Sequence, residues 1–115
     1  MMKKFLIGLI FFTLVSCDYL KKGVEVKIVN NSDGAITDVV FTTSENFETI
    51  EFDSIDANKS VKGFLSMKEN KVDGHYLIKL TRKNGEIESK EIGYYSNGVP
   101  IEEIIEIKIT NDSIK

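Results

Sequence analysis

The chain has 115 residues, of which 15 are basic and 18 are acidic, so its formal net charge is −3. A chain of this length can bury one hydrophobic core but not two. The acidic balance argues against a nucleic-acid partner, because nucleic-acid binding requires clustered lysine and arginine. A single cysteine and a single histidine exclude an internal disulfide framework and a zinc site of ordinary composition.

The first segment along the chain is an apolar run behind two lysines. Lys3 and Lys4 precede residues 5–15, which contain no charged side chain. As a helix this run would be about 16 Å long, at ~1.5 Å per residue. The hydrocarbon core of a bilayer is about 30 Å thick, so the run is too short for a stable transmembrane helix. The pattern is typical of a cleaved export signal, and a buried core helix is the alternative.

The four residues that close this segment, Leu14-Val15-Ser16-Cys17, resemble the lipobox of bacterial lipoproteins. The resemblance implies that residues 1–16 are a signal peptide that is cleaved immediately before Cys17. It also implies that the Cys17 sulfur carries a diacylglycerol and that the new α-amine is acylated, for example by palmitate. We therefore expect a protein of the bacterial cell envelope, held to a membrane by lipid on Cys17. The inner and the outer membrane both stay open.

Residues 17–23 are expected to form a short lipidated tether. Loss of residues 1–16 would remove Lys3 and Lys4 and no acidic residue, which changes the net charge from −3 to −5. Lys21 and Lys22 would lie within about 20 Å of the bilayer, at ~3.3 Å per residue. Anionic head groups attract such charges by ~1 kcal/mol each. The alternative is that both lysines are simply solvated.

Residues 24–115 are expected to form one β-domain. From Val24 onward apolar residues alternate with polar ones, which is the pattern of half-buried strands. The alternating runs are separated by Asn, Asp, Ser and Gly residues that favour turns. We expect strands near residues 24–28, 36–43, 47–55, 61–67, 76–82, 86–95 and 101–109.

About seven short strands with polar turns predict an all-β fold, a small antiparallel β-sandwich of immunoglobulin-like type. The chain has no tryptophan, so it lacks the Cys–Trp–Cys hallmark of true immunoglobulin domains. A closed or half-open barrel is the alternative architecture.

Two details of these strands are specific enough to test. Asn84-Gly85 between two alternating runs predicts a hairpin with a type I′ turn, which requires positive φ at both residues. In residues 101–109, five isoleucines in nine positions favour a strand. The alternative there is a helix, because Pro100 followed by Glu would suit a first helical turn.

Residues suited to catalysis or metal binding are few. His75 is the only histidine, and strand parity places it on the same face as Lys79, where we expect it to be exposed and idle. The sequence contains no G-x-S-x-G or S-x-x-K nucleophile motif, no complete calcium loop and no phosphate-binding glycine motif. We therefore expect a protein without catalytic residues, metal or cofactor.

The candidate binding residues are Tyr94, Tyr95 and Asn97, at the turn Ser96-Asn97-Gly98. Adjacent tyrosines on a strand point to opposite faces, so one can enter the core while the other stays exposed. An exposed tyrosine beside a turn is a frequent interface anchor. The alternative is one core tyrosine and one ordinary surface tyrosine.

The sequence thus favours a membrane-anchored envelope lipoprotein that acts as a non-enzymatic protein-binding module. Inhibitors, immunity proteins and accessory subunits are built in this way, although that is an analogy at the level of the fold. A lipoprotein that binds carbohydrate or cell wall is the alternative.

Two tripeptides suggest a modification. Asp53-Ser54-Ile55 and Asp112-Ser113-Ile114 resemble the Asp-Ser/Thr-aliphatic acceptor of periplasmic O-glycosylation in Bacteroidota. The resemblance implies glycosylation of Ser54 and Ser113.

Overall fold

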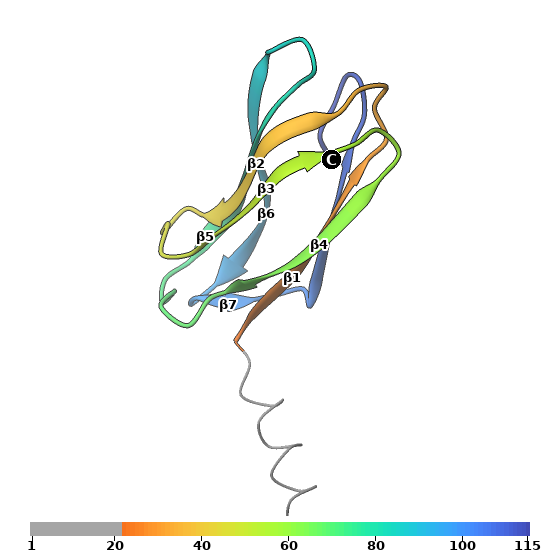
Figure 1. The fold of residues 1–115 in the computed structure, drawn as a ribbon. Coiled ribbons are helices and arrows are strands. Elements are labelled where there is room, and N and C mark those ends of the chain that lie inside the picture. Colours follow the sequence, from red (N-terminus) through yellow and green to blue (C-terminus); the bar gives the residue numbers. More distant parts are fainter. Residues whose placement is uncertain (1–21) are drawn as a thin grey trace, which may run out of the picture.

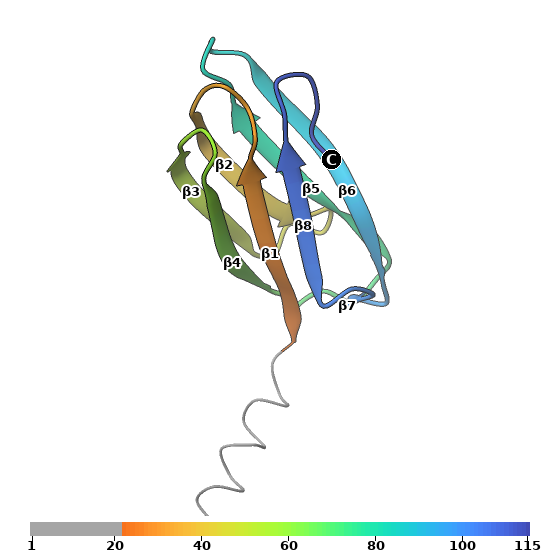
Figure 2. The ribbon, with the colours of Figure 1, turned by 90° about the vertical axis from the view of Figure 1, so that its right-hand side faces the viewer.

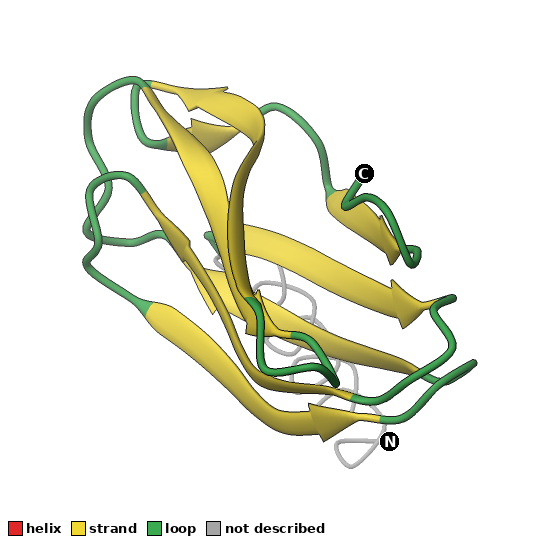
Figure 3. Ribbon diagram, turned by 90° about the horizontal axis from the view of Figure 1, so that it is seen from above, coloured by secondary structure: helices red, strands yellow, loops and turns green. Residues whose placement is uncertain are grey.

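The structure is a computed structural model that describes residues 22–115, so the predicted signal peptide and Cys17 lie outside the described residues. The described chain is all-β, and Figure 3 shows strands and loops without a helix. It has one strand more than the seven expected, because the short β7 was not predicted. The strands are β1 (Gly23–Asn30), β2 (Ile36–Thr43), β3 (Thr49–Ile55), β4 (Ser60–Ser66), β5 (Gly74–Thr81), β6 (Ile87–Ser96), β7 (Val99–Pro100) and β8 (Ile104–Ile109).

These strands form two sheets in a β-sandwich-like arrangement (Figures 1 and 2). A three-stranded sheet has the order β4-β1-β8, and a five-stranded sheet has the order β3-β2-β5-β6-β7. All neighbours are antiparallel except β1 and β8, which run parallel. The expected antiparallel pairing therefore holds for every strand pair except this one. β8 begins at the same end as β1, with Ile104 beside Glu25, so the first and last strands must run the same way.

The strand order also differs from that of constant-type immunoglobulin domains. There, strands A, B, E and D share one sheet, and C, F and G share the other. In this protein the chain leaves the three-stranded sheet after β1, forms β2 and β3 in the five-stranded sheet, and returns at β4. β1 therefore pairs with β4 and β8 rather than with β2.

The apolar residues that alternate in the sequence meet between the two sheets. Phe41 of β2 stacks on Tyr76 of β5, with ring centroids 5.7 Å apart, and Tyr76 meets Tyr95 of β6 at 5.4 Å. Full burial of one large apolar side chain stabilises a fold by ~1.5–3 kcal/mol. The other buried hydrophobic residues are Val24, Val26, Ile28, Ile36, Val39, Ile55, Leu65, Met67, Ile78, Leu80, Ile105, Ile107, Ile109 and Ile114.

The last predicted strand is present, but it begins at Ile104 instead of Ile101. Three alternate isoleucines of β8, at positions 105, 107 and 109, are buried between exposed charged residues. Pro100 lies in β7, opposite Tyr95, at the edge of a sheet where its missing N–H is tolerated. The helical alternative for this segment was wrong.

The hairpin between β5 and β6 is confirmed, but its turn is not of type I′. The N–H of Gly85 donates to the carbonyl of Arg82 at 2.9 Å. Gly85 has a φ of 88°, whereas Lys83 and Asn84 have negative φ, which leaves type I for the hydrogen-bonded turn. A type I turn followed by a left-handed glycine is the usual three-residue hairpin loop. The side-chain oxygen of Asn84 accepts a hydrogen bond from the N–H of Glu86 at 3.0 Å.

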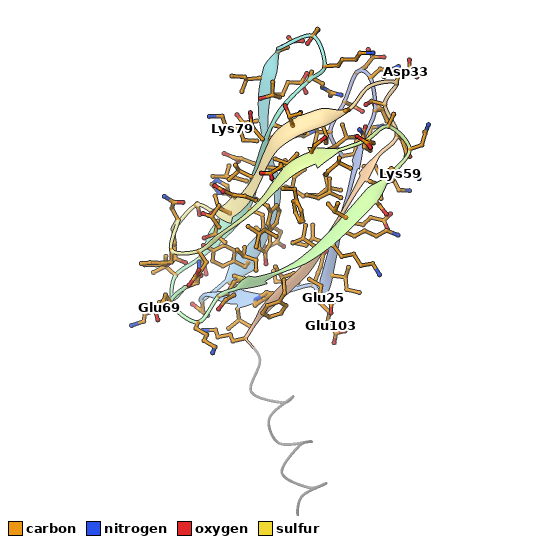
Figure 4. All side chains as sticks on the ribbon, in the orientation of Figure 1. Glu25, Asp33, Lys59, Glu69, Lys79 and Glu103 are labelled. Atoms are coloured by element: carbon orange, nitrogen blue, oxygen red, sulfur yellow. The ribbon has the colours of Figure 1, made fainter. Side chains whose placement is uncertain are left out.

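The loops gather at two opposite ends of the sandwich. β1 begins at the end that also carries the β2–β3, β4–β5, β6–β7 and β7–β8 connections (Figure 1). We call this the tether end, because residues 17–21 immediately precede it in the sequence. In Figure 4, Glu69 and Glu103 lie at the tether end, whereas Asp33 and Lys59 lie at the opposite end.

Candidate functional site

A β-bulge in β6 decides which of the two predicted tyrosines is exposed. Ile92 and Tyr94 pair with adjacent residues of β5, so the intervening Gly93 is an extra residue in the ladder. Gly93 has a φ of 65°, which glycine adopts without steric cost. The bulge reverses the alternation after Ile92. As a result Tyr95 is fully buried, and Tyr94 is 69% exposed.

Tyr95 joins β6 to two loops of the tether end, and through Asn70 to the end of β2. Its hydroxyl donates to Oε1 of Glu45 at 2.8 Å and accepts a hydrogen bond from Nδ2 of Asn70 at 3.2 Å. The same Asn70 nitrogen donates to the hydroxyl of Thr43 at 3.0 Å. These partners come from β2, the β2–β3 loop and the β4–β5 loop. Tyr95 is thus a structural residue that positions its neighbour Tyr94, and it does not itself offer a contact surface.

Glu45 is held in its ionised form by this arrangement. Partial desolvation raises the pKa of the Glu45 carboxyl, but hydrogen bonds outweigh it, so the pKa lies below its usual value. The donors are the Tyr95 hydroxyl, the backbone N–H groups of Lys71 and Val72, and the Asn70 amide. A carboxylate that accepts several hydrogen bonds favours its charged form. The β2–β3 loop is therefore fixed to the β4–β5 loop at neutral pH.

Asn97 and Gly98 form the tight turn between β6 and β7. Their φ values of 52° and 74° are the type I′ combination. The N–H of Asn97 donates to Oδ1 of Asp73 at 2.9 Å, and the N–H of Gly98 donates to the carbonyl of Val72 at 2.9 Å. A Cβ at Gly98 would collide with the backbone of Asn70. The predicted binding turn is thus braced by the β4–β5 loop, and Asn97 maintains its shape.

The tether end carries most of the exposed apolar side chains. In the described part of the chain, Ile87 is the one large hydrophobic residue of comparable exposure at the opposite end. Apolar side chains that gather on a surface mark interaction sites, whereas single ones need no explanation. The tether-end residues that are more than half exposed are Phe47, Val72, Tyr94, Val99, Ile101 and Ile104.

His75 is only half-buried, and it has a partner that no sequence motif indicated. Its Nε2 lies 3.3 Å from Oε1 of Glu91, a diagonal neighbour on β6. The expectation of an exposed, idle side chain is corrected to this extent. The pair lies on the outer face of the five-stranded sheet, beside Tyr94, which is opposite His75 in the ladder.

The two predicted glycosylation sites differ in accessibility. Ser54 is exposed on β3. The hydroxyl of Ser113 lies 2.8 Å from that of Thr110 within a turn, and the next residue, Ile114, is buried. Ser54 is therefore the more accessible acceptor, and glycosylation at either position stays a prediction.

The described residues contain neither a metal-binding cluster nor a membrane-spanning helix. Within residues 22–115, no group of three or more His, Cys, Asp or Glu side chains is placed to hold a metal ion. In that same range no helix has the length and apolar character required to cross a membrane.

Comparisons with known proteins give a fold but no family. No family model matches the sequence, and no curated protein matches it. The structure is similar to the NMR structure of a protein from Eubacterium rectale, with a TM-score of 0.59. The likeness covers 81% of this chain and 82% of that one, at 10% sequence identity. At so low an identity the likeness shows a shared fold alone.

The sequence did not reveal Glu45, Asn70 or Asp73, which hold the turn from other loops. Each is a polar loop residue, and such residues are common. The sequence did contain one local signal, the dipeptide Asn97-Gly98. Asn-Gly favours a type I′ turn, but we expected that turn type at Asn84-Gly85 instead.

Proposed function

We propose that this protein is a lipid-anchored, non-enzymatic module of the bacterial cell envelope that binds another protein through its tether end. The observation that carries the proposal is that six exposed apolar side chains, among them that of Tyr94, come from one end of the sandwich. Val99 and Ile101 lie beyond the adjacent turn, and the hydrogen bonds of Tyr95 and Asn97 brace that turn. An exposed tyrosine beside a braced turn with apolar residues has the composition of an interface hot spot.

The charges at the tether end favour a protein partner over the bilayer itself. Anionic head groups attract basic side chains and repel acidic ones, whereas a protein can offer a complementary basic rim. The loops that carry the exposed apolar residues contain more acidic than basic side chains. The acidic residues include Glu48, Glu69, Asp73, Glu102 and Glu103, and the basic ones are Lys68 and Lys71.

We also propose that the domain is a variant of the immunoglobulin-like class with exchanged strand pairing. The support is its two facing sheets of short strands, linked by connections that cross between the sheets, as in other sandwiches of this class. An experimental structure in which β1 pairs with β2 would contradict the pairing on which this variant depends.

The binding proposal is tested by photo-crosslinking in cells with the full-length, lipidated protein. A photoreactive amino acid replaces Tyr94 or Ile101, and the matched control carries it at Ile87, which is 63% exposed at the opposite end. We expect a discrete protein adduct from positions 94 and 101 and none from position 87. Adducts from position 87 alone, or from none of the three, would contradict the proposal. A heterogeneous polysaccharide adduct would support the carbohydrate-binding alternative instead.

A further inference from the structure

A small hollow lies between β6 of the five-stranded sheet and the beginning of β8 of the three-stranded sheet. Tyr94 lines it from β6, and Glu102 and Glu106 line it from the β7–β8 connection and from β8. Its volume is about 150 Å³. Small-molecule sites usually measure ~300–1,000 Å³. The hollow therefore has room for one side chain rather than for a whole ligand.

The inner part of the hollow is apolar. Tyr76 and Ile105 are buried core residues, and Ile92 is half-buried against the core. A side chain that enters far enough to touch them gains from the removal of apolar surface from water, by ~25 cal/mol per Å². The preferred occupant therefore has an apolar stem.

The rim of the hollow is negatively charged. The nearest cations to Glu106 are the ammonium groups of Lys27 and Lys108, at 4.0 Å and 3.7 Å, which are long distances for ion pairs. Within residues 22–115, Glu102 forms no ion pair. Both carboxylates thus retain the capacity to accept hydrogen bonds from an incoming cation.

The negative charge of Glu102 also acts on Tyr76, at the inner part of the hollow. Burial raises the pKa of Tyr76 to about 12, and the neighbouring Tyr95 and Glu102 add to the rise. Glu102 opposes ionisation of Tyr76 because its own negative charge lies close by. The same charge would attract a cation placed over that ring.

We propose that this hollow receives a lysine or arginine side chain of the partner protein, an inference that rests on the function proposed above. The methylene stem of such a side chain covers Ile92 and Ile105 while its charged head stays at the rim. Glu102 and Glu106 accept charge-assisted hydrogen bonds from the head.

The first test measures binding of a single cationic side chain by NMR. The probe is N-acetylarginine amide, added to the isotope-labelled, lipidated full chain in nanodiscs, and N-acetylcitrulline amide is its neutral isostere. We expect the arginine probe at millimolar concentration to shift the backbone amide signals of Tyr94 and Ile105, and the citrulline probe to leave them unchanged. Equal shifts from both probes, or no shift from either, would overturn the inference.

Matched variants locate the charge that binds. Glu102→Gln and Glu106→Gln should each raise the dissociation constant of the arginine probe about two- to fivefold, as expected for exposed ion pairs. Glu51→Gln makes the same charge change at an exposed position of β3 and should leave the constant unchanged. An equal effect of all three variants would mean that net charge alone attracts the probe. Shifts from ethanolamine as large as those from arginine would indicate a lipid head group and overturn the assignment to a side chain.

A second experiment separates this inference from the function on which it rests. The crosslink from position 101 is measured in cells that carry Glu102→Arg or the control Glu51→Arg, with folding checked by NMR. Loss of the adduct in Glu102→Arg alone supports the inference. An adduct that persists in Glu102→Arg overturns the cation site but leaves the binding module intact. If the parent chain gives no adduct, the proposed function fails, whatever the arginine probe does.

Discussion

The Tyr95 hydroxyl and the Glu45 carboxylate form a hydrogen bond of 2.8 Å across fifty positions of the sequence. Tyr95 immediately follows the exposed Tyr94, and Glu45 lies in the β2–β3 loop. The bond therefore connects the candidate binding turn, near one edge of the five-stranded sheet, to the β2–β3 loop near the opposite edge. A rigid frame of this kind reduces the entropy that a binding surface loses when a partner binds.

Tyr95→Phe tests whether this bond stabilises the fold. Removal of the buried hydroxyl should lower the free energy of unfolding by about 1–2 kcal/mol, because Asn70 also loses an acceptor. Tyr94→Phe is the matched control, and it should leave stability unchanged because its hydroxyl is exposed. Urea unfolding of residues 18–115 measures both variants. Equal losses from the two would contradict the structural role of Tyr95.

Acidification should weaken the same network. Because its folded pKa is lowered, Glu45 contributes stability at pH values above its ordinary pKa of 4.5. That contribution is lost as the pH falls through the lower pKa of the folded state. Melting temperatures measured across this acidic range should fall less steeply in Glu45→Gln than in the parent protein. Glu51→Gln serves as a control and should retain the steep fall.

Alanine substitutions at two turn glycines can distinguish the cost of backbone strain from that of steric collision. Gly85 has positive φ, but a Cβ there would have no neighbour within 4 Å. Gly85→Ala should therefore cost about 1–2 kcal/mol, from left-handed strain alone. Gly98→Ala adds a collision with the Asn70 backbone, so its cost should be clearly larger. Thermal unfolding that ranks Gly85→Ala as the more harmful change would refute the assignment of the β6–β7 turn.

Lipidation of Cys17 is directly testable in the host. Globomycin, which blocks the lipoprotein signal peptidase, should cause the uncleaved chain to accumulate. Cys17→Ser should reduce incorporation of labelled palmitate to background. Normal processing and labelling of the serine variant would end the lipoprotein interpretation.

The proposal that the protein is not an enzyme can be tested at His75, its only histidine. Its contact with Glu91 lies at the surface and is of the kind that contributes little, so His75→Ala should change stability by about 0.5 kcal/mol or less. The crosslink from position 101 should persist in this variant. Loss of the cellular function of the protein with the fold and the crosslink intact would restore a catalytic role for His75.

Much of the local structure could be predicted from the sequence. The expected strand at residues 36–43 coincides with β2, and the alternate isoleucines of β8 are buried as the pattern required. This succeeds because a strand places successive side chains on opposite faces, so a half-buried strand leaves its period in the sequence. The partition of Tyr94 and Tyr95 between surface and core was predictable for the same reason. Their role in binding stays a prediction.

Tertiary structure decided the features that join distant segments. The bulge at Gly93 selects Tyr95 for the core, and a period of two after Ile92 would have selected Tyr94. The parallel pairing of β1 with β8 and the convergence of Glu45 and Asn70 on Tyr95 likewise leave no local pattern. Such contacts join segments that are far apart in the sequence, and each must compensate the entropy of closing a long loop. The sequence thus determined the strands and a pair of candidate tyrosines and predicted a lipid anchor, whereas the pairing of distant segments and the bulge at Gly93 decided which tyrosine is exposed.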